Sequence, residues 1–500
     1  MSALAPTLPA EWKAPSEDGQ LLIWPDAGQI IEQTRANHDY LAKSNASLMN
    51  LPLRELRDAV RKWLGHSDDR PLIATGHQVE LYHAGVWAKH VLINALAAKL
   101  DGSAVHFAVD TDAPKHLHLR WPGGSSSLTD DPRLSTAAWS GLLESPTPAH
   151  VDAIRGQFDL AASKWNFRPL LPQFLSSMKR LSADSGSLAQ NLTNGIHALD
   201  WQLGLRYHAM TASPIWQSPG YLLFAAHVLS RAADFASIYN STLAEYRRLA
   251  NVRNPTRPWP DLKLTGDQCE VPFWCDDLAA QTRVRAYVEP TASGAALSIH
   301  GESIELDRSA NGWALARRFG QFLAAHSLRL SPRALTLTVF LRLCAADQFV
   351  HGIGGGRYDQ VTDRVIRSFI GIDPPAFSVT TATLLFPMAA SQKLVDIRAL
   401  RLEGRRLRHG WADPAKRQLA RRIAGLPRKS PQRRQLYTHM HESLAAAIKD
   451  GPYADWRRRW NEVQHLHSQQ ARLFDRELFF AIQSESRLKT LAARYHDRLT

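Results

Sequence analysis

Residues 75–89 read TGHQVELYHAGVWAK, and the segments on either side of this stretch decide how it folds. The preceding run, 71–74, is apolar and too short for a helix, so it indicates a buried strand. The segment 91–100 is apolar around most of its circumference and predicts a buried helix, and 104–109 then predicts a second strand. Strand, helix and strand within about 40 residues form a βαβ unit, whose two strands run parallel.

This topology places polar residues from distant parts of the stretch at one edge of a sheet. Ligands of parallel sheets bind outside the carboxyl ends of the strands. Gly76, His77 and Gln78 leave the first strand at that edge, and Asp110 and Asp112 leave the second. We therefore expect these side chains to line one crevice.

His77 and Gln78, together with His83 and Lys89, suit contact with a small polar ligand or a phosphate. The alternative is that they cap and pack the loop. His77 and His83 are six positions apart, which does not match the spacing of metal ligands on a helix, so we expect no metal there.

Asp110 and Asp112 form the acidic part of the predicted crevice. Two carboxylates one residue apart can hold a divalent ion, bind sugar hydroxyls or act as a base. The alternative is a turn capped by an Asp side chain before Pro114. If the site is catalytic, Asp110, Asp112 and His77 are the candidate catalytic residues.

The stretch 351–357 reads HGIGGGR and is the most phosphate-like feature of the chain. Its four glycines would let backbone N–H groups approach an anion, and the helix expected after it would add its positive N-terminal end. The spacing matches no named nucleotide-binding motif, and a tight turn is the alternative. The sequence names no cofactor, although an ATP- or ADP-like nucleotide would suit such a loop. The ligand contacts predicted here are His351, Gly352, Gly354, Gly355, Gly356 and Arg357.

Composition limits the class of protein. The chain of 500 residues can bury a large core and should form more than one structural unit. It has neither a long uncharged apolar run nor a basic-then-apolar N-terminus, so we expect no membrane span and no secretory signal. Cys269, Cys275 and Cys344 are too few for a disulfide framework and too scattered for a zinc site. We expect a cytoplasmic protein.

The net charge of +13 is concentrated in one segment. Residues 401–434 contain twelve Lys or Arg against only Glu403 and Asp413. Such a segment could bind nucleic-acid phosphates. A solvated arm, or a dimer interface with charged flanks, is the alternative that we favour.

Residues 391–475 have helical patterning with a break near 425–427, which fits two long antiparallel helices. We expect this hairpin to project and to carry a homodimer contact. Its apolar stripes are Leu394, Ile397, Leu400, Leu407, Leu419, Ile423 and Leu426 on one side, and Leu436, Met440, Leu444 and Ile448 on the other.

The chain divides by pattern into five segments. Residues 1–150 are the N-terminal part of the core, 151–260 a helical connecting region, and 261–390 a small β insertion followed by the second part of the core. Residues 391–475 are the helical hairpin, and 476–500 a C-terminal helix that returns to the core. Within the third segment, Ser331-Pro332 predicts the start of a helix that runs to Leu343.

Taken together, the pattern resembles the bacillithiol biosynthesis cysteine-adding enzyme family. The sequence departs from that family at three places. His77 stands where the family usually has a glutamine, Thr111 where a histidine is expected, and 357–359 differ after the glycines. The resemblance itself rests on 75–78 with Gly85, on 110–112, on 349–355, and on 374–375 and 382–384.

The resemblance implies a Rossmann-like parallel-sheet core with helical and small β insertions and a C-terminal antiparallel helical hairpin, a coiled coil. This is the α/β fold class that we predict. It also implies ligation of cysteine to a sugar-malate amine acceptor. The leading expectation is a ligase- or transferase-like enzyme with a small-molecule substrate. The alternatives are a nucleic-acid-binding protein that uses the basic hairpin, and a non-catalytic dimeric scaffold.

Overall fold

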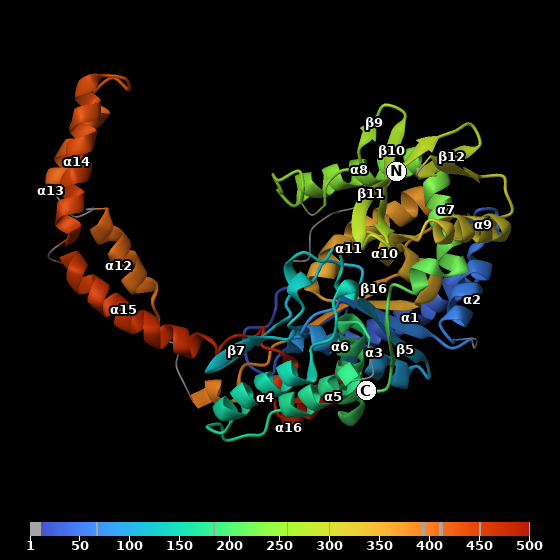
Figure 1. Ribbon diagram of the computed structural model, residues 1–500, viewed down its shortest axis with the longest axis horizontal. Helices are drawn as coiled ribbons and strands as arrows, with labels where there is room; N and C mark the ends of the chain where they lie inside the picture. Colours follow the sequence, from blue (N-terminus) through green and yellow to red (C-terminus); the bar gives the residue numbers. More distant parts are fainter. Residues whose placement is uncertain are drawn as a thin grey trace. The chain divides into compact units, whose positions relative to one another are not determined.

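The computed structural model describes residues 12–499, apart from 67–68, 184–185, 258, 300, 392–395, 410–413 and 450–451. The chain divides into two compact units (Figure 1). Unit 1 consists of residues 1–120, 124–384 and 476–500, and unit 2 of residues 121–123 and 385–475.

Unit 1 is a mixed α/β structure built around a six-stranded sheet. Five neighbouring strands run parallel, and β1 joins one edge antiparallel to β16. A sheet with this many parallel strands must be covered on its faces. Its central strands β16, β15, β4 and β5 are accordingly buried over most of their length. In spatial order the strands are β1 (Leu21–Trp24), β16 (Phe377–Ala382), β15 (Gln348–His351), β4 (Leu72–Gln78), β5 (Ser103–Val109) and β8 (His208–Thr211).

The predicted βαβ unit is present as β4, helix α3 (Ala84–Lys99) and β5, and its strands are parallel. Its element boundaries differ from the prediction in two places. Strand β4 continues to Gln78, because the ladder with β5 extends to Gln78 opposite Val109. Helix α3 begins at Ala84, seven residues before the expected start, because the side chain of His83 caps it.

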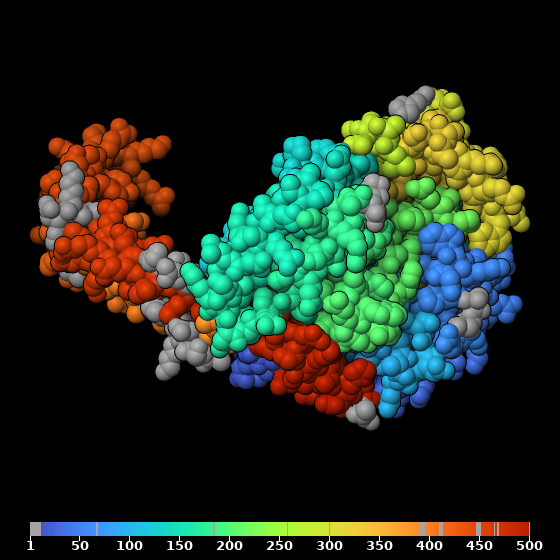
Figure 2. Space-filling model, turned by 60° about the horizontal axis from the view of Figure 1, so that its bottom comes forward, coloured from blue at the N-terminus to red at the C-terminus, as the bar shows by residue number. Residues whose placement is uncertain are grey.

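Helices surround this sheet, and those expected between 151 and 249 are present. The pattern at 222–249 is two helices, since the backbone leaves the helical conformation at Arg231. Figure 2 shows the C-terminal segment lying on the same face as helices from residues 150–250. The helices are α1 (Ala27–Ala42), α2 (Leu53–Trp63), α4 (Pro148–Ala162), α5 (Leu171–Ala183), α6 (Leu188–Gln202), α7 (Pro219–Ser230), α8 (Ala232–Leu249) and α16 (Glu485–Leu499).

A second, antiparallel sheet lies within the segment 261–390, where a small β insertion was predicted. Helix α9 (Gly312–Ala325) follows most of its strands along the chain. The helix start predicted at Ser331 is wrong. Ser331 lies in a strand opposite Trp274, and its hydroxyl donates to Asp276 at 2.6 Å instead of capping a helix. Helix α10 therefore begins later (Ala334–Phe340), and the strands in order are β13 (Glu302–Asp307), β12 (Gly294–Ile299), β11 (Thr282–Pro290), β10 (Gln268–Asp277) and β14 (Leu328–Pro332).

Unit 2 is helical, as expected, but its described residues form four α-helices in place of two long ones. Its small core includes Trp456, whose indole packs against Gly404 and donates to the carbonyl of Leu400 at 2.7 Å. The helices are α12 (Arg398–Arg408), α13 (Pro414–Ala424), α14 (Pro431–Lys449) and α15 (Pro452–Ala471).

The predicted apolar stripes of unit 2 are buried only in part. Ile397, Ile423 and Met440 are buried. Leu394 and the side chain of Ile448 lie outside the described residues. Across the described ranges of both units, we find no helix that combines the length and the apolar character needed to cross a membrane.

Candidate functional site

A pocket of about 550 Å³ lies in unit 1 at the carboxyl ends of β4, β15 and β16. Strands β4 and β15 are neighbours, yet β4 is followed by β5 on one side and β15 by β16 on the other. The connections thus diverge between these two strands, which is where open α/β sheets bind ligands. The lining residues are Trp12, Lys13, Ala14, Gly76, His77, His83, Gly85, Val86, Lys89, His351, Gly352, Ile353, Gly354, Gly355, Arg357, Thr381, Arg476 and Glu477.

The glycines after β15 form the first turn of helix α11 (Ile353–Val365) and not a free loop. None of the glycines from Gly352 to Gly356 has a positive φ, so their conformation alone does not demand glycine. The first N–H groups of any α-helix lack an intrahelical acceptor. Gly352 is the N-cap and makes no side-chain cap bond. This turn therefore presents backbone donors and the positive end of the helix dipole to the pocket.

The three consecutive glycines of this turn have different surroundings. A Cβ atom on Gly354 would meet nothing within 4 Å, so this position opens onto the pocket. A Cβ on Gly355 would lie 2.8 Å from Nδ1 of His351. A Cβ on Gly356 would lie 2.4 Å from Val379, and Gly356 is buried outside the pocket lining. Gly356 thus serves packing, while Gly354 and Gly355 face the site.

His351 is held by a buried charged pair behind the pocket wall. Its Nε2 lies 2.9 Å from Oδ2 of Asp359, and Arg342 donates to the same oxygen at 2.5 Å. Burial alone would raise the pKa of Asp359, but Arg342 and His351 outweigh it and hold that pKa well below its usual value. The ionised carboxylate accepts from Nε2–H, which leaves Nδ1 of His351 on the side of Gly355.

Lys89 brings an amine with an unusual environment to the same pocket. The residue is only 2% exposed, and its Nζ donates to the carbonyl of Gly76 at 2.8 Å. Burial lowers the pKa of Lys89 to about 7, although Glu80 opposes the shift. A lysine in this state can take up or release a proton near neutral pH, and its neutral form is a nucleophile.

Glu80 and His77 complete this proton-exchanging cluster. Burial raises the pKa of Glu80 to about 7, against the effect of Lys89. Burial and the nearby Lys89 hold the pKa of His77 well below its usual value, so the ring stays neutral. Nδ1 of His77 lies 3.3 Å from Oε1 of Glu80 and 3.2 Å from the carbonyl of Gln78, so that nitrogen carries the proton. Because the His77 ring is neutral, its contact with Glu80 is not an ion pair.

Arg476 and Gly85 close the pocket on the side of β16. Arg476 donates to Thr381 Oγ1 at 3.3 Å and to the carbonyl of Ala382 at 3.2 Å. A Cβ on Gly85 would lie 2.5 Å from Thr381 Oγ1 and 2.8 Å from Nη2 of Arg476. Only glycine therefore allows α3 to approach this arginine so closely.

The predicted ligand contacts fall into two groups. Gly76, His77, Lys89 and most of the residues after β15 line the pocket. His83 also lines it, but its Nδ1 accepts from the N–H of Gly85 at 3.0 Å and caps α3. Burial and Arg476 lower the pKa of His83 to about 4, so this cap stays neutral. Gln78, Asp110, Asp112 and Gly356 are absent from the lining.

The acidic pair expected in the crevice makes structural contacts instead. Asp110 is buried, and its carboxylate accepts from the N–H of Ser213 at 2.8 Å and from the Ser213 hydroxyl at 2.6 Å. Asp112 pairs with the side-chain amide of Gln78 across the ends of β5 and β4. The crevice expected as one is therefore divided, with the pocket on the β15 side of β4 and these two carboxylates on the β5 side.

Sequence reasoning missed four polar contributors to the pocket. Thr381 ends a parallel strand, so the same edge rule would have indicated it once β16 was placed. The other three, Lys13, Arg476 and Glu477, lie in segments where no sequence motif indicates a binding site.

No model of a known protein family matches this chain, and a search of curated proteins finds no match either.

The pocket is predominantly cationic. Lys13, Lys89, Arg357 and Arg476 line it together with the amino end of α11, and Glu477 is the acidic member of the lining. Within the described ranges, His, Cys, Asp and Glu side chains form no group of three or more that could hold a metal ion. The arrangement suits binding of an anionic small molecule beside groups that exchange protons near neutral pH.

Proposed function

We propose that unit 1 is a ligase- or transferase-like enzyme that acts on a small molecule carrying a phosphate or carboxylate group. An ATP- or ADP-like nucleotide is one such ligand. The observation that supports this most strongly is the convergence on one pocket of the uncapped first turn of α11 with Lys89, Arg357 and Arg476. Backbone donors and arginines are the groups that proteins use for phosphate and carboxylate.

Each group has a proposed role in that pocket. The N–H groups at Ile353 and Gly354 receive the anion, and Arg476 neutralises its charge. Lys89, with a pKa of about 7, passes a proton to or from the reacting group. His351, oriented by Asp359, positions the ligand beside the first turn of α11.

The proposal also includes the type of core in unit 1 and the specific reaction. The β4–α3–β5 unit with its pocket at the strand ends supports a Rossmann-like core. The resemblance noted from 75–78 and 349–355 adds the specific reaction, ligation of cysteine to a sugar-malate amine, in a distant relative of the cysteine-adding enzymes.

A thermal-stability screen tests the proposal. A ligand that binds the native state at about 100 times its Kd stabilises that state by about 2.7 kcal/mol. We expect ATP, ADP, pyrophosphate or malate to raise the melting temperature of the wild type. The shift should be lost in Arg476→Gln and kept in Arg318→Gln, a matched change at an exposed arginine of α9. The proposal fails if none of these anions shifts the melting temperature, or if both variants respond like the wild type.

Unit 2 has a separate proposed role as the contact of a homodimer, with its helices arranged as a coiled coil. Leu402, Tyr437 and Leu466 are large apolar side chains that stay exposed there. Deleting 401–450 and rejoining the ends with a short linker should convert a dimer to a monomer in light scattering. An unchanged mass in solution would contradict this role.

A second candidate function is nucleic-acid binding by unit 2. The observation in its favour is that the arginines of α12 and α13 are exposed, among them Arg401, Arg405, Arg406, Arg421 and Arg422. Phosphate contacts release counterions, so binding of this kind should weaken steeply as salt rises from about 50 to 200 mM. Anion binding in the unit 1 pocket should depend much less on salt.

A further inference from the structure

Strands β11 and β12 begin as a hairpin and then separate. They pair only next to their turn, at Glu289 opposite Ala296 and at Pro290 opposite Ala295. Each strand continues to pair with its other neighbour beyond that point. β10 pairs with β11 as far as Thr282, and β12 pairs with β13 as far as Ile299. The two strands therefore turn facing edges toward a gap in the sheet.

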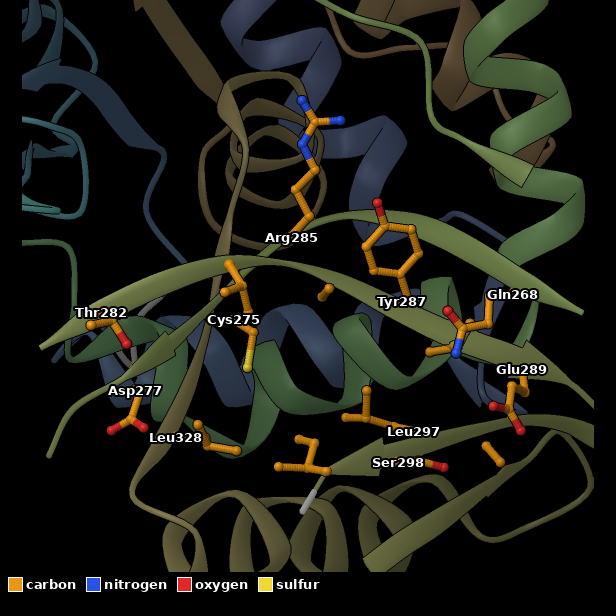
Figure 3. Close-up of a pocket in the computed structure, with 15 residues that line it drawn as sticks. Gln268, Cys275, Asp277, Thr282, Arg285, Tyr287, Glu289, Leu297, Ser298 and Leu328 are labelled. Atoms are coloured by element: carbon orange, nitrogen blue, oxygen red, sulfur yellow. The ribbon is translucent and has the colours of Figure 1, made fainter. Parts of the chain in front are cut away.

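A pocket of about 450 Å³ occupies the gap (Figure 3). Among the described residues, the backbone groups of 282–288 on this side of β11 and of 297–299 on β12 make no backbone hydrogen bond across the gap. Unpaired strand edges are templates for pairing with another extended chain. A chain inserted here could pair with β11 on one side and with β12 on the other.

The burial of β11 shows that its core face is uncovered at the gap. Side chains at every second position of a strand share one face. On β11 these are Val288, which is 1% exposed, Ala286, which is 3% exposed, and Val284, which is 62% exposed. Exposure thus rises along one face as β12 departs. Figure 3 shows Cys275 and Leu297 on this side of the strands, and Arg285 and Tyr287 on the other.

The charged residues around the pocket indicate what charge the ends of a bound peptide should carry. Asp277 and Glu289 lie near opposite ends of the paired strands β10 and β11. Arg285 is the cation of the lining, and it already pairs with buried Glu270 at 3.2 Å. The carboxylates are therefore the charges left to complement an incoming chain.

We propose that the gap between β11 and β12 binds an extended peptide by strand addition, one with alternating apolar residues in its centre and basic residues at its ends. The peptide backbone pairs with both facing edges, as in other modes of β-augmentation. Its apolar side chains cover Val284, Cys275 and Ile299, and its basic ends meet Asp277 and Glu289. This function is independent of the anion pocket and adds a peptide partner to unit 1.

A synthetic peptide tests the proposal on the full-length protein. The probe has Lys at each end and alternating Val and Thr between them, about seven residues in all, to match the length of edge that β11 offers. We expect saturable binding by fluorescence polarisation and slower amide hydrogen exchange at 282–288 and 297–299. Cys275 supplies a second readout, because it is partly exposed whereas Cys269 and Cys344 are buried. Its alkylation should slow when the peptide fills the gap.

Two altered probes separate strand addition from simpler binding. N-methylation of the central amides removes backbone donors and should abolish binding. Replacing both Lys by Glu should weaken binding, because like charges then meet Asp277 and Glu289. The proposal is overturned if the N-methylated probe binds as well as its parent, since a small apolar ligand site would give that result.

A pair of protein variants completes the test. Val284→Lys should weaken the probe about tenfold, the loss expected for one buried Val side chain. Leu264→Lys is the matched control, because Leu264 is also 62% exposed and lies on β9 (Leu264–Thr265) of the same sheet, away from the gap. Equal affinity in both variants overturns the proposal. So does self-association through 282–288 that the probe cannot displace, because a second copy of the chain would then be the occupant.

Discussion

Lys89 should make the stability of unit 1 depend on pH in an alkaline window. The side chain is 2% exposed, and its pKa falls from 10.5 in the unfolded chain to about 7 in the folded protein. Between these values the unfolded chain holds a proton that the folded protein has released. Stability rises with pH wherever the unfolded state binds more protons. Lys89 therefore penalises folding in full below pH 7, and the penalty disappears as the pH approaches 10.5.

The size of the effect follows from the shift. Within the window, the free energy of unfolding rises by about 1.4 kcal/mol per pH unit, which amounts to about 5 kcal/mol from pH 7 to 10.5. Glu80 does not interfere, because its pKa rises from 4.5 to about 7 and its contribution changes below the window. Between pH 7.5 and 9.5, we expect Lys89 to account for about 2 to 3 kcal/mol of increased stability.

Urea unfolding of Lys89→Met measures this contribution. The free energy of unfolding of the wild type should increase relative to that of the variant by the stated amount between pH 7.5 and 9.5. Lys99→Met is the matched control, because Lys99 lies on the same helix, α3, but is exposed. The reasoning is refuted if Lys89→Met and Lys99→Met show the same dependence on pH.

Four other substitutions have distinct expected outcomes. Gly354→Val should stay folded and lose about tenfold in pyrophosphate affinity by calorimetry, whereas Gly356→Val should lose about 3 kcal/mol of stability to overpacking in urea. Asp359→Asn removes one of the two carboxylates that pair with buried Arg342, the other being Asp363 at 2.7 Å, and should cost about 3 kcal/mol in the same assay. Gly404→Ala places a Cβ 2.0 Å from Trp456, so limited proteolysis should cut within 398–471 while unit 1 remains intact. Unchanged pyrophosphate affinity in Gly354→Val would contradict the first expectation. Wild-type stability in Gly356→Val or Asp359→Asn, or wild-type protease resistance in Gly404→Ala, would contradict the others.

The sequence predicts individual strands and helices of this fold well, but it predicts poorly the residues at which they begin and end. The βαβ unit is encoded by contiguous apolar runs, so β4, α3 and β5 were predictable. The end of β4 was not, because Gly76 and His77 are poor strand residues that pair only because β5 lies beside them. The start of α11 was missed for a similar reason, since three glycines rarely begin a helix.

The site shows the same division. The edge rule placed Gly76 and His77 at the carboxyl end of β4, where the pocket lies, because it depends only on strand direction. It could not assign Asp110, whose partner Ser213 follows β8, a strand that the sequence did not reveal. Arg476 is more than 380 positions from Lys89, and no local pattern could place the two in one pocket.

The order of strands in the central sheet has a consequence for synthesis of the chain. The ribosome delivers β4, β5 and β8 within the first 211 residues, but β15, the other neighbour of β4, comes much later. Thr75 and Val350, which meet across β4 and β15, are 275 positions apart. A growing chain therefore exposes one edge of β4 through most of translation, and such edges invite aggregation unless a chaperone covers them.

The pocket in unit 1 is also completed late. The wall at Thr381 and Arg476 is completed only when residue 476 has left the ribosome, out of 500. Any product that terminates early carries the first lining residues without the arginine that closes the site. The route of assembly therefore leaves a truncated chain with an incomplete pocket.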